Sequence, residues 1–366
     1  MRSFLALLSL MTWPAFTVAA PLQHDLELVL EPATAELRVT DRLTLPADPT
    51  ERCFTLQRGL APTLDGPVPL TEVPGSGTLG RYCLPQTGER FVLHYGGTLQ
   101  ATDPAPAAHA GLNLYPGSGW YPRFGETLAR FRLAVDLPAG WRSVSQGERL
   151  SRTTYGGRTR ETWHEPRPQD GLYLIAAPFH EYAGRAGAVR TLALLREPAP
   201  ELAERYLKAT ARHLDFYNRL LGPYPYAKFA LVENFWDSGY GMPSFTLLGP
   251  RVIRLPFIVE TSYPHEILHN WWGNGVYVDP AGGNWSEGLT TYLADHLLAE
   301  RQGRGAEHRR AALQRYADYV HSGRGFALSD FNRRHNEVSQ SVGYDKGLMV
   351  FHMLRRELGD AAFIDG

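Results

Sequence analysis

The sequence predicts an α+β fold with two domains: an antiparallel β domain over residues 21–187 and a domain of strands and helices over 188–366. Two observations support this division. From about residue 21 to 185, short alternating segments are separated by Gly and Pro at close intervals, which is typical of antiparallel strands. Near residue 188 the spacing of apolar residues becomes helical. A chain of 366 residues, 43% of them hydrophobic, has enough core for two or three domains.

The first 20 residues have the pattern of a secretory signal peptide. Arg2 supplies a positive charge, an apolar run extends from Phe4 to Val18, and the small residues around Ala19 provide a cleavage site. A membrane anchor is the alternative, but Trp13-Pro14 interrupts a run that is already short for a span. No later stretch approaches a transmembrane length. We therefore expect an exported protein, secreted or periplasmic, without a membrane span.

Net charge argues against one class of binding partner, and the cysteine content predicts a disulfide. The formal net charge is -1 and the basic residues form no run, so we expect no nucleic-acid partner. Cys53 and Cys83 are the only two cysteines. Export to an oxidising compartment predicts a disulfide between them, and two buried free thiols are the alternative.

The N-terminal strands are predicted from period-two alternation. Leu26–Leu30 and Glu36–Thr40 alternate on either side of Pro32, and Phe131–Leu137 is the clearest alternating segment. No catalytic motif occurs in this region. The aromatic segment Trp120–Arg123 is expected in the core or at an interface, with a position facing a cleft as the alternative.

The second region begins with a helix and two strands. Residues 201–221 carry apolar side chains at helical spacing, and Gly222-Pro223 ends the helix. Short strands are expected over Phe229–Val232 and Phe245–Leu248. The glycine-containing segment between these strands includes Gly241 and Met242, and a substrate backbone can approach the edge of such a strand. A simple turn explains the same segment equally well.

The central motif of the chain is His265-Glu266-Ile267-Leu268-His269. On a helix the two histidines lie about 40° apart around the axis and one turn apart, so both imidazoles can bind one ion. A catalytic Zn²⁺ has three protein ligands and one open position for water. Glu266 lies about 100° around the axis from His265, where it can act as a general base toward that water.

The third metal ligand is expected from the next helix. With Ser286 as N-cap, Glu287 falls in the first turn, where the helix dipole favours its negative charge. A carboxylate oriented in this way suits a zinc ligand. Thr261 or Ser262 is the expected N-cap of the preceding helix. Two further helices are expected over 306–321 and from near residue 344 to 358.

Three motifs together resemble the aminopeptidase N-like family of gluzincin metallopeptidases. They are the segment 265–274, Ser286-Glu287-Gly288 and Tyr344-Asp345-Lys346-Gly347. Leu221–Lys228 and the N-terminal β region also resemble the corresponding parts of that family, so the resemblance covers essentially the mature chain. It implies that residues 188–366 form a thermolysin-like catalytic domain with a mixed sheet and helices.

The resemblance also implies a role for each matching residue. His265, His269 and Glu287 would bind one Zn²⁺, and Glu266 would activate the attacking water. Tyr344 would donate a hydrogen bond to the oxyanion of the tetrahedral intermediate, which stabilises a charge present mainly in the transition state.

Two departures from the family pattern concern the substrate and the length of the chain. The family's usual G-x-M-E-N segment, whose Glu binds the substrate's α-amine, reads Gly241-Met242-Pro243-Ser244 here. Glu233 or Asp237 is a candidate substitute, with an ordinary loop acid as the alternative. The sequence continues for 22 residues after Tyr344 (366 − 344), where the family's domain is longer, so an incomplete catalytic domain is expected.

The expected function is that of an exported zinc metallopeptidase of aminopeptidase type, acting on peptide or protein substrates. One alternative is a zinc endopeptidase, or another zinc hydrolase, that lacks α-amine anchoring. The other is a non-catalytic, zinc-containing peptide-binding protein.

Overall fold

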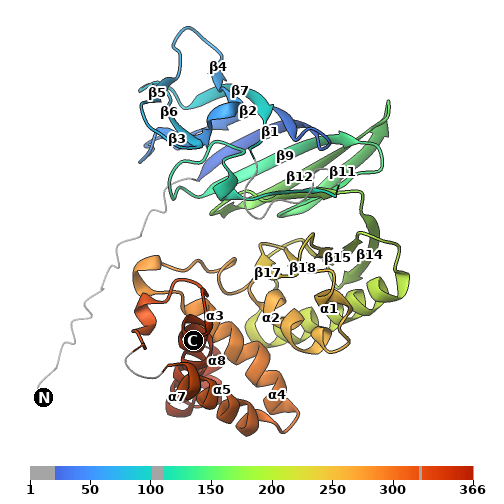
Figure 1. Ribbon diagram of the computed structural model, residues 1–366, viewed down its shortest axis with the longest axis vertical. Helices are drawn as coiled ribbons and strands as arrows, with labels where there is room; N and C mark the ends of the chain where they lie inside the picture. Colours follow the sequence, from blue (N-terminus) through green and yellow to red (C-terminus); the bar gives the residue numbers. More distant parts are fainter. Residues whose placement is uncertain (1–20, 101–109, 321–323, 366) are drawn as a thin grey trace, which may run out of the picture.

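The computed structural model describes residues 21–100, 110–320 and 324–365, and it shows a β region stacked on a region of sheet and helices (Figure 1). The predicted signal peptide, residues 1–20, lies outside the described residues. The α+β fold class is confirmed: sheets, with two short 3-10 helices at Arg58–Leu60 and Pro116–Ser118, form the described N-terminal part, whereas a mixed sheet and several α-helices form the C-terminal part.

The N-terminal region is built around a seven-stranded sheet with the order β11-β12-β9-β1-β2-β7-β4. Its strands are β1 (Leu22–Glu31), β2 (Glu36–Thr44), β4 (Thr63–Leu64), β7 (Arg90–Thr98), β9 (Ala129–Pro138), β11 (Glu148–Tyr155) and β12 (Arg158–Gln169). The three alternating segments predicted from the sequence lie within β1, β2 and β9. Neighbouring strands are antiparallel except β1 and β9, which run parallel. This parallel pair is possible because nearly 100 residues connect the two strands, which allows a crossover.

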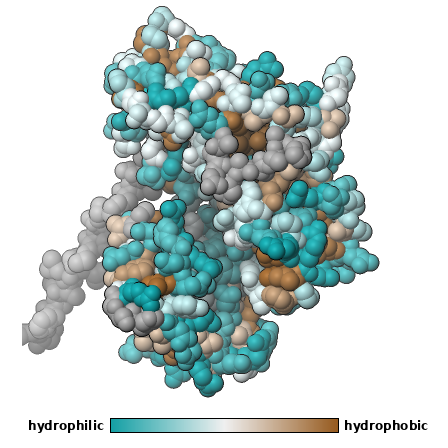
Figure 2. All heavy atoms as spheres, viewed as in Figure 1, coloured by the Kyte–Doolittle hydropathy of each residue, from teal (hydrophilic) through white to brown (hydrophobic). Residues whose placement is uncertain are grey.

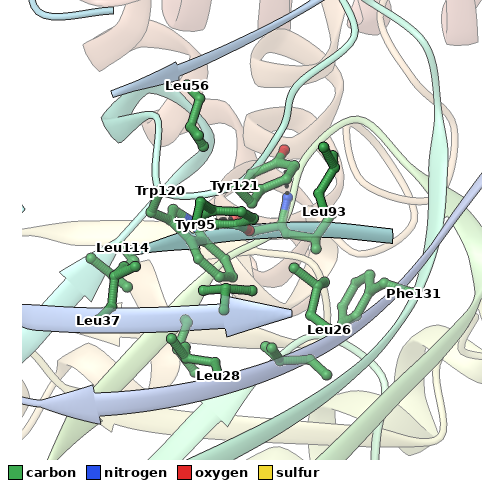
Figure 3. Close-up of a cluster of buried hydrophobic side chains, with 14 of the residues drawn as sticks. Leu26, Leu28, Leu37, Leu56, Leu93, Tyr95, Leu114, Trp120, Tyr121 and Phe131 are labelled. Atoms are coloured by element: carbon green, nitrogen blue, oxygen red, sulfur yellow. Dashed lines mark hydrogen bonds between the residues drawn. The ribbon is translucent and has the colours of Figure 1, made fainter. Parts of the chain in front are cut away.

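The core of this region lies under the seven-stranded sheet, where alternate residues of β1 and β2 point inward (Figure 3). Trp120 and Tyr121 belong to that core, with exposed fractions of 0% and 2%. The Trp120 indole donates a hydrogen bond to the carbonyl of Leu172, and the Tyr121 hydroxyl accepts one from the Leu172 amide. Of the two positions considered for this aromatic segment, packing in the core is therefore confirmed.

Two three-stranded sheets complete the N-terminal region. The first, with the order β3-β6-β5, contains β3 (Cys53–Gln57), β5 (Thr71–Val73) and β6 (Leu79–Cys83). Cys53 and Cys83 lie opposite each other on β3 and β6 and form the predicted disulfide, with Cα atoms 4.0 Å apart. The second sheet, with the order β10-β13-β8, contains β8 (Leu112–Leu114), β10 (Arg142–Ser145) and β13 (Leu174–Ala177).

The second region contains a five-stranded mixed sheet with the order β14-β15-β16-β18-β17. Its strands are β14 (His180–Ala186), β15 (Val189–Leu195), β16 (Lys228–Glu233), β17 (Gly239–Met242) and β18 (Phe245–Leu248). The sheet begins before the expected domain boundary at residue 188, because β14 forms a hairpin with β15. The glycine-containing segment is a strand and not a simple turn: it is β17, antiparallel to β18 at the edge of the sheet.

The two faces of this sheet pack against different partners. Leu192 and Val232 point into an apolar cluster that they share with Val144 and Ile175 of the N-terminal region. Residues next to them in sequence on β15 and β16, such as Ala193, point instead into the cluster under the helices. The shared cluster fixes the N-terminal region against one face, and helix packing covers the other.

One helix lies between β15 and β16 and the others follow β18, and apolar residues on several of them pack into the core. They are α1 (Pro200–Leu221), α2 (Ser262–Leu268), α3 (Trp285–Thr291), α4 (Leu297–Arg301), α5 (Gly305–Tyr319), α6 (Glu337–Gln340), α7 (Gly347–Leu358) and α8 (Asp360–Asp365). Two π-helical segments, Tyr292–His296 and Ser341–Lys346, join α3 to α4 and α6 to α7 without a break. The last predicted helix therefore begins at Glu337, before residue 344.

Among the described residues, no helix is both long enough and apolar enough to cross a bilayer. Figure 2 shows one face of the molecule, which is largely hydrophilic and carries hydrophobic residues in separate patches.

The disulfide predicts a measurable stability difference. Because Cys53 and Cys83 are 30 residues apart, replacing both with Ala should lower the free energy of unfolding of the N-terminal region by about 3 kcal/mol. Urea unfolding, followed by tryptophan fluorescence, measures the change. Reductant should shift the wild-type midpoint toward that of the variant and leave the variant unchanged; equal midpoints without reductant would contradict the prediction.

Candidate metal centre

Helix α2 places both histidines of the motif at the bottom of a cleft. Tyr263, Ile267 and Leu268 are fully buried under α1 and anchor the helix in the core. His265 and His269 consequently face away from that core, with ring centroids 4.9 Å apart. Thr261 occupies the N-cap position, one of the two positions predicted, but its hydroxyl donates to the carbonyl of Phe257 and makes no capping hydrogen bond.

Helix α3 supplies the predicted carboxylate. Its N-cap is Asn284 and not Ser286: the Asn284 side-chain oxygen accepts from the Ser286 amide at 3.2 Å and from the Ser286 hydroxyl at 2.6 Å. Glu287 is therefore the third residue of the helix, still in the first turn, as expected. Asparagine directly before a helix is a favoured cap, so the sequence did contain this signal.

The three predicted ligands converge on one point. Glu287 Oε2 lies 3.4 Å from His265 Nε2 and 3.4 Å from His269 Nε2, and it is buried without a hydrogen-bond partner among the described residues. Ligand atoms bound tetrahedrally to zinc at about 2.0–2.1 Å are separated by roughly 3.3–3.4 Å. Within the described part of the chain, no other group of three or more His, Cys, Asp or Glu side chains brings its ligand atoms together in this way. The donor set and its spacing fit Zn²⁺.

Both imidazoles are oriented by hydrogen bonds on their outer nitrogens. His265 Nδ1 donates to Asp295 Oδ2 at 2.8 Å, and His269 Nδ1 donates to the carbonyl of Trp272 at 3.2 Å. These bonds place the protons on Nδ1 and turn both Nε2 lone pairs toward Glu287. Such partners raise the basicity of histidine ligands and fix their orientation.

Sequence reasoning missed Asp295, and the spacing shows why. Asp295 lies eight residues after Glu287, an interval that a regular α-helix would offset by about 80° around its axis. The π-helical segment Tyr292–His296 widens that turn, and Glu287 and Asp295 both contact His265. Nothing in the local composition predicts such a segment, although π-turns are frequent at functional sites.

The electrostatics of the centre favour an anionic ligand beside a basic carboxylate. Burial would raise the pKa of Glu287, but His269 and His265 lower it well below its usual range. Burial raises the pKa of Glu266, against the opposing effect of the same two histidines. Glu287 therefore stays ionised as a ligand, whereas Glu266 is more basic than an ordinary glutamate and suited to accept a proton.

Two glycines of β17 make room for the Glu266 carboxylate. A Cβ atom on Gly239 would lie 3.2 Å from Glu266 Oε1, and one on Gly241 would lie 3.0 Å from Glu266 Oε2 and from His269. This close approach explains why the edge strand carries glycines opposite the motif. Met242 follows them, lines the same cleft and packs against the apolar cluster behind it.

Tyr344 reaches the centre from the other wall. Its ring is nearly parallel to that of His265, with centroids 6.0 Å apart. Burial, followed by the charges of Glu287 and Glu266, raises the pKa of Tyr344 well above its usual value. The phenol is therefore protonated and able to donate a hydrogen bond.

A glycine contact holds the two walls together. The backbones of α3 and α7 touch at Gly288 and Gly347, where a Cβ on either residue would lie 2.8 Å from the Cα of the other. Gly288 follows Glu287 directly, and Gly347 lies three residues after Tyr344. The contact therefore sets how closely the backbones that carry Glu287 and Tyr344 approach each other.

The cleft at this centre has a volume of about 950 Å³. All seven residues predicted for the site line it: Gly241, Met242, His265, Glu266, His269, Glu287 and Tyr344. The two candidate substitutes for an amine-binding acid lie elsewhere. Glu233 is buried in an ion pair with Arg254 at 2.6 Å, and Asp237 pairs with Arg251. Neither lines the cleft, so neither is placed to bind a substrate amine there.

Ser244, in the segment that corresponds to the family's amine-binding motif, has a structural function. Ser244 adopts a left-handed backbone conformation, φ 67°, at the turn between β17 and β18. Its amide donates to Asn270 Oδ1 at 2.6 Å, and its hydroxyl accepts from Lys228 Nζ at 2.6 Å and from the Gly147 amide at 3.1 Å. The turn is thereby tied to the residue after His269, to β16 and to the N-terminal region.

Comparison with known sequences gives distant relatives and no matching family model. A leukotriene A-4 hydrolase from Xenopus laevis is 28% identical over 203 residues, covering 51% of this chain and 33% of that protein. Human endoplasmic reticulum aminopeptidase 2 is 23% identical over 276 residues, covering 67% of this chain and 28% of that protein. The chain thus spans about a third or less of the length of these curated relatives.

Solved structures share the fold over almost the whole chain. An M1 zinc metallopeptidase from Deinococcus radiodurans superposes with a TM-score of 0.71 at 23% identity, covering 94% of this chain and 85% of that one. Native yeast LTA4 hydrolase gives a TM-score of 0.70 at 16% identity, covering 94% of this chain and 60% of that one. The predicted resemblance to the aminopeptidase N-like gluzincins is confirmed, with its thermolysin-like mixed sheet and helices.

The hydrogen bond from His265 to Asp295 predicts an effect on metal affinity. Asp295→Ala should lower zinc affinity about 10–100-fold, because the imidazole loses the acceptor that orients it. Asp295→Asn, which retains an acceptor oxygen, should lose less. Competition with a chelator of known affinity measures both values, and exposed Asp330→Ala is the control; zinc affinity unchanged in Asp295→Ala would contradict the role.

Proposed function

We propose, on the premise that the chain has the fold of the M1 zinc metallopeptidases, that it is a zinc-dependent peptidase of aminopeptidase type. One observation carries the proposal: three ligand atoms converge within 4.8 Å of one another, and Glu266 and Tyr344 line the same cleft. A related M1 zinc metallopeptidase mutant from Deinococcus radiodurans is described as bound to a Tyr-Ser-Ala substrate. That likeness supports short peptides as the substrate class.

His265, His269 and Glu287 would hold the ion, which when bound supplies Lewis-acid chemistry to the water and the substrate carbonyl. Among the described residues, Glu266 has no hydrogen-bond partner that would compete for its carboxylate. Burial raises the pKa of Glu266, so this carboxylate is more basic than an ordinary glutamate. It would accept the proton of the attacking water and transfer it to the leaving amine. The glycines of β17 have no side chains that would displace this carboxylate from its place beside the edge strand.

Tyr344 would stabilise the negative oxygen that forms as the carbonyl is attacked. Burial and the nearby carboxylates raise the pKa of Tyr344, so its phenol stays protonated. Its ring lies beside that of His265. A donor fixed in this position before the reaction acts mainly on the transition state. Holding a metal or a peptide requires neither this phenol nor Glu266, which argues against a non-catalytic zinc-containing peptide-binding protein.

A second candidate function is a zinc endopeptidase, or another zinc hydrolase, that does not anchor the substrate amine. The turn after β17 favours it, because Pro243 and Ser244 stand where the family's amine-binding acid would lie. Recognition of an ammonium group by pairing normally requires such an acid.

The proposal includes export, to a periplasm or to the outside. The Cys53–Cys83 disulfide supports this location, because disulfides persist in oxidising compartments. The signal-peptide pattern of residues 1–20 supports it as well.

Replacing the proposed base separates metal binding from chemistry. Glu266→Gln should retain about one zinc per chain and lose about 10²–10⁴-fold in kcat on a peptide substrate, because the amide cannot accept the proton. Metal analysis and peptide hydrolysis are measured on the same preparation. Full activity in this variant would rule out the mechanism.

The two candidate specificities differ on blocked and free amines. If the chain is of aminopeptidase type, it should release the N-terminal residue from a free tripeptide and from an amino-acyl arylamide, and it should leave the N-acetylated tripeptide intact. Chromatography of the products distinguishes these substrates. Cleavage of the acetylated peptide alone would establish the second candidate instead.

A further inference from the structure

The acidic and basic side chains that line the cleft differ in whether they have partners. Most of its carboxylates already have partners: Glu287 faces the two histidines, Asp295 accepts from His265, and Asp345 pairs with Arg315 at 2.6 Å. Glu266 is the carboxylate reserved for proton transfer. The described lining therefore offers no further acid to bind a substrate cation.

Two arginines of the cleft lining, by contrast, are free to bind an anion. Arg333 and Arg334 both line the cleft. Arg333 makes no hydrogen bond or ion pair with another described residue. Arg334 has only a 3.7 Å ion pair with Glu337 among those residues, and the two side chains are 53% (Arg334) and 56% (Glu337) exposed. An ion pair this long and this exposed contributes little, so both guanidinium groups can bind another anion.

The loop that carries these arginines is fixed to the catalytic elements. Asn284, the cap of the helix that bears Glu287, donates its side-chain amide to the carbonyl of Asn332 at 3.2 Å, and its backbone amide donates to that of Phe331 at 2.6 Å. Phe331 is buried and packs edge-on against Tyr344, with ring centroids 6.2 Å apart. On the other side of the pair, Asn336 caps α6.

The geometry connects the two arginines to the metal centre. Arg333 and Arg334 line the same cleft as His265 and Tyr344, and Phe331, which packs against Tyr344, lies two residues before Arg333. A peptide that fills this cleft would therefore contact both the centre and the two guanidinium groups.

We propose that Arg333 and Arg334 form a subsite for a carboxylate of the substrate. This inference rests on the proposed peptidase function and specifies its substrate class: peptides with an anionic group within a few residues of the cleaved bond. Guanidinium groups bind carboxylates through paired, charge-assisted hydrogen bonds. The carboxylate can come from a free C-terminus or from an acidic side chain, and the two sources are distinguishable.

Two matched pairs of peptides test the subsite. The first pair is Ala-Ala-Ala with a free C-terminus and the same peptide as its amide. The second is Ala-Glu-Ala amide and Ala-Gln-Ala amide. In at least one pair, wild-type kcat/KM should favour the carboxylate about tenfold or more, mainly through KM. Preference within the first pair assigns the C-terminus, and preference within the second assigns the side chain.

The variant Arg333→Gln/Arg334→Gln should abolish that preference and retain turnover of the neutral member of each pair. Arg356→Gln, an exposed arginine on α7 outside the cleft, is the matched control and should preserve the preference. No preference for either carboxylate in the wild type, or an unchanged preference in the double variant, would overturn the proposal.

Binding measured without turnover separates this proposal from the peptidase assignment. Calorimetry on zinc-loaded Glu266→Gln, with and without the two arginine substitutions, reports the affinity of each peptide. If the wild type hydrolyses none of them, the peptidase function fails, and calorimetry still decides the subsite. Equal affinity for the carboxylate and neutral members would then remove it.

Discussion

The structure depends on one buried carboxylate oxygen placed between two imidazole nitrogens. Glu287 Oε2 has no hydrogen-bond donor among the described residues and lies 3.4 Å from each histidine. A buried anion is unfavourable unless it is paired, so this arrangement is stable only with positive charge at its centre, carried by protons or by a metal ion. The surrounding elements serve mainly to hold that oxygen in place: the Asn284 cap, the two outer hydrogen bonds of the histidines and the burial of α2.

The substrate-facing parts are attached to this centre by separate connections. The edge strand β17 is held through Ser244, which links the turn after the strand to Asn270, Lys228 and Gly147. The opposite wall is held through Asn284 and Phe331, which position the loop before α6. Both walls of the cleft are thus held in place by hydrogen bonds to elements next to the metal centre. The N-terminal region contributes directly, because the Gly147 amide belongs to it.

The sequence predicted the ligand set and much of the fold because these depend on local pattern. The side chains of His265, His269 and Glu287, which the motif spacing grouped, do converge. Alternation located β1, β2 and β9 within a few residues, and short apolar runs located β16 and β18. Features determined by tertiary contacts were not predictable in this way. The π-helical turn that aims Asp295, the parallel pairing of β1 with β9 and the hairpin that includes β14 arise from partners distant in sequence. Tyr344 was recognised only through the resemblance, since spacing alone does not distinguish it from other tyrosines.

The meeting of Gly288 with Gly347 has a further consequence for how the chemistry is assembled. Only hydrogen atoms separate the two main chains there, so the backbones next to Glu287 and Tyr344 cannot come closer at this point. A methyl group on either glycine would clash with the other helix, and a close-packed interior could accommodate it only if α3 or α7 moved. Glu287 and Tyr344 would then each keep their local contacts but lie farther apart. These two glycines therefore set the spacing between the helix that carries Glu287 and the helical segment that carries Tyr344.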